Sequence, residues 1–173
     1  MILSNAMQKL IKETVDEIYV VFELPTHTPI DLDELLNKLG VQLRGNTELM
    51  YEGKIEKEHN NKTIITIKHH HDEKRRRFAI AHTLGHYFLH FSDDDKEFKD
   101  SVFYRNLDYN NEEVEANEFA FNLLMPEEEY KKYAENNAYN FKNNTCDVRK
   151  ISEYFKVPKQ IVVYRGKSLK IFK

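Results

Sequence analysis

The chain has 173 residues, of which 40% are hydrophobic and 32% charged, and its formal net charge is −3. This length predicts one compact domain. The small net charge gives no general reason to expect a nucleic-acid or membrane partner. Its single cysteine, Cys146, excludes an internal disulfide framework and a cysteine-rich zinc site, and fits a reducing cytoplasm. We find no apolar run near the roughly 18 residues of a membrane span and no signal peptide, so we expect a cytoplasmic protein.

The sequence predicts a single domain, because it contains no internal repeats and no low-complexity linkers. Residues 1–6 precede a second methionine, and Ser4-Asn5-Ala6 is typical of the remnant of a cleaved tag. We therefore interpret residues 1–6 as an expression scar. The domain is expected to span residues 7–173, with a helical basic segment at 147–173.

The N-terminal part of the chain predicts two helices followed by strands. Apolar residues recur at three- and four-residue intervals from Met7 to Glu23, as on an amphipathic helix. Asp31 begins a second helix with a capping-box pattern, and Gly40 closes it. Short β-branched segments and turn residues between Val41 and Lys68 predict a small antiparallel sheet of about three strands.

The remainder of the chain predicts mainly helices. The longest runs from Asp72 to Phe91 without a proline, and a loop rich in Asp, Ser and Asn follows it. A second strong helix runs from Asn111 to Met125, where Pro126 ends it. Further helical patterns cover 127–136 and 148–154. A turn at Val157-Pro158 then precedes a last helix or strand.

Charge is unevenly distributed, with acidic residues concentrated in 108–135 and basic residues in 142–173. The simpler interpretation is that these are solvated faces of the fold. The alternative is that the basic segment docks DNA, since 151–165 has a faint helix-turn-helix spacing with Arg165 late in its second helix. We favour packing of these helices on the domain, because side chains that read bases are sparse there.

His82-Thr83-Leu84-Gly85-His86 is the most informative pattern in the chain. Histidines four residues apart on a helix lie on one face and can bind one Zn²⁺, as in the H-E-x-x-H motif of zincin metallopeptidases. The glutamate of that motif is the general base. Thr83 occupies its position and cannot take a proton from a metal-bound water at neutral pH.

A third metal ligand is expected from the helix that begins at Asn111. Its segment Glu113-Val114-Glu115-Ala116-Asn117 has the form E-x-x-A-[DN]. Glu113 would be the carboxylate ligand, and Asn117, one turn later, would orient a histidine through its second ring nitrogen. Ala116 is small enough to permit a close approach of the two helices.

The other histidines have simpler interpretations. His69-His70-His71 is interpreted as a polar strand end. His90 continues the helical face of His82 and His86, but lies too far along the helix to be a fourth ligand. We expect it to pack or to contact substrate.

Two separated blocks resemble the ImmA/IrrE family of zincin-like metallo-endopeptidases. Residues 77–90, RFAIAHTLGHYFLH, are similar to the family's R-F-[TS]-[LI]-A-H-E-L-G-H-x-x-L-H. Residues 113–126, EVEANEFAFNLLMP, are similar to E-x-E-A-N-x-F-A-x-x-L-L-M-P. A weaker similarity at 148–157 extends the resemblance to roughly 31–165.

The resemblance implies a helix-rich α+β fold of zincin (gluzincin) type, with a small sheet beside the metal-bearing helix. It implies metal ligands at His82, His86 and Glu113, and a hydrolase that cleaves a specific repressor encoded on a mobile element or in a stress-response operon. Thr83 is the departure from the family pattern, and it places the peptidase activity in question.

We therefore expect a pseudoenzyme that retains weak zinc binding and takes part in transcription regulation by binding a repressor-type protein. The strand Thr63-Ile64-Ile65-Thr66-Ile67 is expected to accept a partner peptide at its edge. The competing interpretation is an active, site-specific zinc endopeptidase with an unconventional base, for which Glu73 and Glu112 are candidates. A third is a DNA-associated regulator that uses the basic C-terminal segment. The sequence indicates no oligomeric state.

Overall fold

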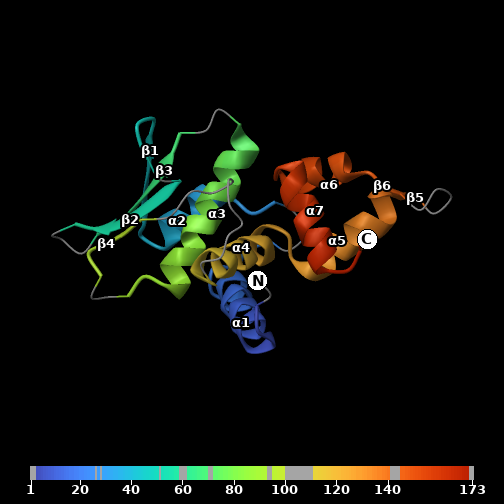
Figure 1. Ribbon diagram of the computed structural model, residues 1–173, viewed down its shortest axis with the longest axis horizontal. Helices are drawn as coiled ribbons and strands as arrows, with labels where there is room; N and C mark the ends of the chain where they lie inside the picture. The colour runs from blue at the N-terminus through green and yellow to red at the C-terminus, as the bar shows by residue number, and fades with distance from the viewer. Residues whose placement is uncertain are drawn as a thin grey trace.

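A small sheet lies on one side of two central helices, α3 and α4, and the C-terminal helices lie on the other side (Figure 1). The α1 helix crosses beneath the central pair (Figure 1). The computed structural model describes residues 3–25, 27, 29–50, 52–58, 62–69, 72–92, 95–99, 111–140 and 145–171. Several sequence features therefore lie outside the described residues: Met1 and Ile2 of the predicted scar, the turn residues Asn60-Asn61, His70-His71, most of the predicted loop after α3, and residues 172–173.

The helices fall where the sequence predicts them. Their bounds are α1 Asn5–Val21, α2 Leu32–Lys38, α3 Glu73–Leu89, α4 Asn111–Leu124, α5 Glu127–Tyr133, η1 Ala134–Ala138 (a π-helix), α6 Val148–Phe155 and α7 Lys159–Ser168. The segment after Val157-Pro158, for which the sequence allowed a helix or a strand, is the helix α7. None of the described helices is long and apolar enough to cross a membrane.

Short polar side chains set where several of these helices begin. Asp31 accepts a hydrogen bond from the Glu34 backbone at 3.0 Å, and Asp72 and Asp147 cap α3 and α6 in the same way. Ser4 accepts one from the Met7 backbone at 3.2 Å. The α1 helix thus begins inside the segment that the sequence suggested to be an expression scar, and that interpretation remains a prediction.

The main sheet has four strands in the order β1-β3-β2-β4. Their bounds are β1 Gln42–Asn46, β2 Gly53–Lys57, β3 Thr63–Lys68 and β4 Glu97–Lys99. The β1–β3 pair is parallel, and the β2–β3 and β2–β4 pairs are antiparallel. A separate two-stranded ladder joins β5 Tyr139–Asn140 to β6 Thr145–Cys146.

The predicted α+β, helix-rich class is confirmed, but the sheet differs from the predicted antiparallel one of about three strands. The additional strand, β4, has only three residues and one apolar side chain, Phe98, so it has no periodic signal. The parallel pair arises because β3 returns from β2 and then pairs with β1 on its other side. Pairing partners of this kind depend on tertiary contacts, which a local pattern does not encode.

The prediction that Thr63–Ile67 offers a free strand edge is wrong. These residues form β3, which is paired with β1 on one side and with β2 on the other. They are all buried, as expected of an inner strand, with Ile64 and Ile65 completely so. The edges of the described sheet are β1 and β4.

Candidate metal centre

The two predicted histidines and the predicted glutamate meet at one point. His82 and His86 project from α3 and are completely buried, and Glu113 lies in the first turn of α4 with its side chain 20% exposed. The two Nε2 atoms are 3.1 Å apart. The Glu113 carboxylate oxygens lie 3.3 Å from Nε2 of His82 and 3.6 Å from Nε2 of His86.

This geometry fits a zinc ion. With Zn–N and Zn–O distances of about 2.0–2.2 Å, ligand atoms around a tetrahedral ion lie roughly 3.3–3.5 Å apart. The two Nε2 atoms and the nearer Glu113 oxygen of each histidine (Oε2 for His82, Oε1 for His86) are separated by distances close to that range, and one ligand atom from each of the three residues lies within 4.8 Å of the others. Two imidazoles and a carboxylate are also the donor set of catalytic zinc sites, in which the fourth position is left open. His82, His86 and Glu113 would hold the ion, and the fit rests on their own positions.

Asn117 orients the first histidine. Its Oδ1 lies 3.1 Å from Nδ1 of His82. Because an amide oxygen can only accept, Nδ1 must carry the proton, which leaves the lone pair of Nε2 directed at the metal position. The sequence predicted this contact from the one-turn spacing between Glu113 and Asn117.

The second histidine is oriented by a pair that the sequence analysis did not identify. Nδ1 of His86 lies 3.0 Å from Nδ1 of His90, and Nε2 of His90 lies 2.9 Å from a Glu115 carboxylate oxygen. Protons on Nδ1 of His86 and Nε2 of His90 satisfy both contacts and again free a ring nitrogen for the metal. His90 was expected to pack or to contact substrate. Two sequence features could have predicted this pair: the four-residue spacing that places His90 one turn after His86, and the position of Glu115 inside the α4 motif.

A glycine allows α4 to come close enough for Glu113 to reach the histidines. A Cβ atom built on Gly85 would lie 2.9 Å from both Cα and the carbonyl oxygen of Ala116. Real Cβ atoms do not approach other heavy atoms that closely. The predicted close approach at Ala116 is therefore present, and it depends equally on the missing side chain of Gly85.

Thr83 follows His82 on α3, and its hydroxyl is unpaired among the residues that the structure describes. Its side chain is 1% exposed, and its Oγ1 makes no hydrogen bond within the described part of the chain. A buried hydroxyl without a partner is unusual and costs about 1–3 kcal/mol. The general-base position of the motif thus holds a neutral, poorly satisfied hydroxyl.

The structure does not bring the two candidate substitute bases to this position. Glu73 is ten residues before Thr83, roughly 15 Å along the axis of α3, and lines a separate cavity with Asp31 and Lys156. Glu112 is exposed and points in a different direction from its neighbour Glu113, since successive residues on a helix are about 100° apart.

The short strand β4 borders the centre. The ring of Phe98 lies 4.6 Å from the His86 ring, centroid to centroid, at an angle of 33°. Phe98 pairs with Ile55 of β2, so this edge of the sheet is held against the metal-bearing helix. The Phe98 ring therefore packs against His86 at the edge of the candidate centre.

Arg165, which the helix-turn-helix alternative placed late in its second helix, is buried. It is 1% exposed and donates hydrogen bonds to the Met125 carbonyl at 3.2 Å and to Asn122 at 2.9 Å, and its guanidinium lies 3.2 Å from a Glu118 carboxylate oxygen. Burial lowers the pKa of Arg165, and the Glu118 carboxylate opposes that shift. Arg165 therefore fastens α7 to α4 inside the protein.

Comparisons with known proteins agree with this architecture. The family model described as the IrrE N-terminal-like domain, Peptidase_M78, matches residues 37–167. No curated protein matches the chain. Among solved structures, a Mycobacterium tuberculosis transcriptional regulator is similar in fold, with a TM-score of 0.50 and 15% sequence identity. The alignment covers 94% of this chain and 47% of the regulator, so the chain spans about half of that protein's length.

Proposed function

Because this chain belongs to the IrrE N-terminal-like (Peptidase_M78) family, we propose that it is a zinc-binding regulator that recognises a specific repressor-type protein and has little or no peptidase activity. The observation that carries the proposal is the combination of a complete ligand set with a missing base. His82, His86 and Glu113 converge, whereas the position of the catalytic glutamate holds Thr83.

The missing base limits turnover more than it limits binding. A zinc ion in this site would polarise a peptide carbonyl as a Lewis acid. Hydrolysis also needs a group that accepts a proton and returns it to the leaving amine, and a positioned acid–base residue contributes about 10²–10⁴-fold. Thr83 can hold a water by a hydrogen bond, but its hydroxyl is too weak a base to accept that proton.

Two features support retention of the metal. The orienting contacts from Asn117 and from the His90–Glu115 pair are intact, and each fixes a ring so that Nε2 faces the same point. Such outer contacts raise metal affinity, and they also satisfy ring nitrogens that are buried in the protein. The proposal therefore separates the metal site, which is preserved, from the proton-transfer step, which is lost.

The partner is proposed to bind along β4. Within the described sheet β4 pairs only with β2, so its outer edge can form main-chain hydrogen bonds with an extended peptide. Phe98 lies on the same strand and against His86, which would place a bound segment beside the metal. We propose a repressor-type partner because the resemblance to the family implies one.

The test compares wild type with Thr83→Glu and with Thr83→Gln, which has nearly the size of glutamate but is not a base. The substrate is a candidate repressor-type protein, incubated with zinc-loaded protein. We expect Thr83→Glu to cleave it at least about 100-fold faster than wild type and Thr83→Gln do, and we expect wild type to bind it with little or no cleavage. Cleavage by wild type as fast as by Thr83→Glu would instead establish an active endopeptidase with an unconventional base.

Binding of DNA by the remaining basic residues of 147–173 is a separate alternative. It is tested by a mobility-shift assay over a salt series, in which phosphate contacts must produce a salt-dependent affinity. A sequence-specific complex of the protein with DNA that persists at physiological salt would favour an operator DNA over a protein as the partner.

A further inference from the structure

The main sheet has a second edge, the strand β1, on the opposite side from β4. In the described part of the chain β1 pairs only with β3, and that pairing is parallel. Two inner strands separate β1 from β4, which places the two edges roughly 14 Å apart. The β1 edge is therefore distinct from the edge that borders the metal centre.

The outer side of β1 presents the backbone groups of Leu43 and Gly45. Successive residues of a strand direct their N–H and C=O groups to opposite sides. The Asn46 carbonyl faces β3, since it accepts a hydrogen bond from the His69 N–H at 3.0 Å. By this alternation Leu43 and Gly45 face outward, and none of their four backbone groups has a hydrogen-bond partner among the described residues. Gly45 is exposed and Leu43 is half-buried, so a second chain can reach them.

A groove of about 440 Å³ lies between α2 and this edge. Leu36, Val41 and Leu43 form its apolar wall. In a pair of strands, the residue directly opposite Leu43 lies on the same face of the sheet, so its side chain would enter the groove. An apolar side chain is favoured there because it is removed from water against these three residues.

The other face of β1 carries an accessible cation, Arg44. Its side chain is 45% exposed, and only its Nη2 atom is engaged, with Glu58 at 3.2 Å and with Gln42 at 3.4 Å. The remaining N–H groups of the guanidinium face no acceptor in the part of the chain that the structure describes. A carboxylate on the residue opposite Arg44 would meet them, and opposite charges that face each other across two strands stabilise the pair.

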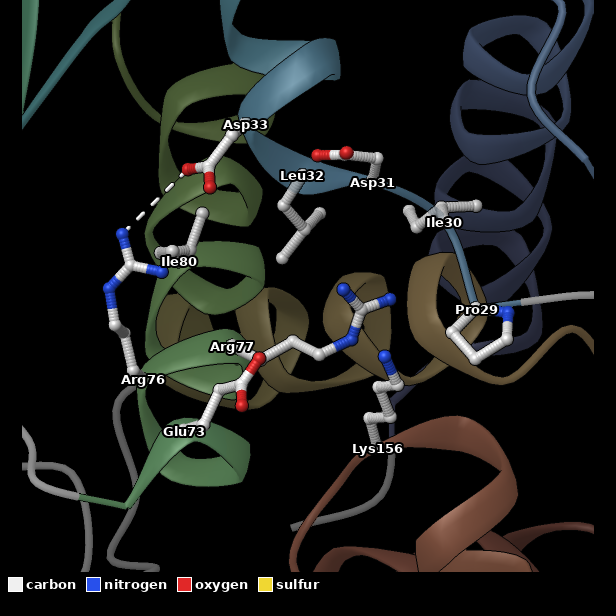
Figure 2. A pocket seen from close by; sticks show the side chains of 10 residues that line it. All are labelled: Pro29, Ile30, Asp31, Leu32, Asp33, Glu73, Arg76, Arg77, Ile80 and Lys156. Atoms are coloured by element: carbon white, nitrogen blue, oxygen red, sulfur yellow. Dashed lines mark ion pairs between the residues drawn. The ribbon is translucent and has the colours of Figure 1, made fainter.

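The other charges beside this edge also favour an acidic partner. Lys62 lines the groove and is exposed. Asp33, the acidic residue of the groove lining, is directed at Arg76 and lies 3.7 Å from it (Figure 2). With Glu58 paired to Arg44, these five described side chains leave one net positive charge at the edge.

We propose that the β1 edge binds an extended segment of another protein in which apolar and acidic residues alternate. Its main chain would pair with Leu43 and Gly45, its apolar side chain would enter the groove, and its acidic side chain would meet Arg44. A second copy of β1 fits less well. The antiparallel register that satisfies all four outward backbone groups places the two Arg44 side chains directly opposite each other, which is unfavourable.

The test uses two synthetic peptides, acetyl-(Val-Asp)₄-amide and acetyl-(Val-Lys)₄-amide, which have the same alternation and differ in charge. Each is titrated into ¹⁵N-labelled full-length protein at constant ionic strength, and the backbone amide shifts locate the binding. We expect the aspartate peptide to shift the amides of Leu43 and Gly45 saturably, with a Kd of about 0.1–1 mM. The lysine peptide should bind at least about tenfold more weakly.

Two variants separate the backbone contribution from the charge. Gly45→Pro removes an outward N–H at a strand edge, where proline is tolerated, and should weaken binding at least about tenfold. Arg44→Gln leaves the backbone unchanged and should weaken binding of the aspartate peptide about fivefold. It decides the test if Gly45→Pro fails to fold. Arg149→Gln, which changes an exposed arginine of α6, is the control and should bind as wild type does.

Several results would overturn the proposal. These are absence of binding, equal binding of the two peptides, equal binding by wild type and Arg44→Gln, and amide shifts confined to β4. Shifts of the β1 amides that depend on protein concentration without peptide would also overturn it, because they would assign the edge to a second copy of the chain.

Discussion

Gly85 of α3 and Ala116 of α4 are in direct contact, because the Ala116 backbone occupies the space that a Gly85 side chain would need. This contact sets the distance between the two helices. Glu113 lies almost one turn before Ala116, and His82 and His86 lie on either side of Gly85. The geometry of the candidate metal site thus depends on this contact between the helix backbones as well as on the three ligand residues.

Substitution of Gly85 by alanine should destabilise the protein. In an unconstrained helix, Gly→Ala raises the free energy of unfolding by about 0.5–1 kcal/mol, but here the added Cβ must push α4 away, at a cost of about 1–3 kcal/mol. Urea unfolding should show a net loss. Gly45→Ala is the control, since its Cβ would meet only Nδ1 of His69 at 4.0 Å. A Gly85→Ala protein more stable than wild type would show that the contact does not determine the spacing.

Removal of the Asn117 amide should weaken metal binding without unfolding the protein. Asn117→Ala frees the His82 ring to rotate and to change tautomer, and lost outer contacts of this kind lower metal affinity about 10–100-fold. Competition with a chromophoric chelator measures the change. Asn37→Ala, on the exposed face of α2, is the matched control and should bind zinc as wild type does. If Asn117→Ala bound zinc as tightly as wild type, Asn117 would have no role in orienting His82 for the metal.

The Arg165–Glu118 pair should contribute strongly to stability. Arg165 has a side chain that is 2% exposed, so Glu118→Ala leaves a buried guanidinium without its main counter-charge. Breaking a buried pair on one side costs about 3–5 kcal/mol, and the remaining contacts to Asn122 and Met125 place this case near the lower end. Chemical unfolding compared with Glu128→Ala, an exposed glutamate of α5, measures it. A loss no larger than that of the control would show that α7 is held by apolar packing alone.

The sequence predicted the helices and the residues of the candidate metal centre because both are local or periodic features. The spacing of His82 and His86 fixes their common face, and the capping aspartates mark helix starts. Glu113 could be found because its motif also lies on one helix. The predictions that used only intervals within one helix or one motif therefore agree with the structure.

The features that the sequence did not predict depend on contacts between distant segments. The strand β4 has only Phe98 as an apolar residue, and its assignment depends on pairing with β2. The inner position of β3 depends on its pairing with β1, which is a contact between separate segments of the chain. The buried pair of Arg165 with Glu118 joins residues that are 47 positions apart, so nothing local to Arg165 in the sequence indicated its burial.

The zinc content of purified protein tests the central claim most directly. Protein freed of chelator, supplied with excess zinc and then desalted should contain about one zinc per chain by plasma emission spectroscopy. Glu113→Ala should lower that content markedly, because it removes one of the three ligands. Wild-type protein with a zinc content near zero after this treatment would contradict the account.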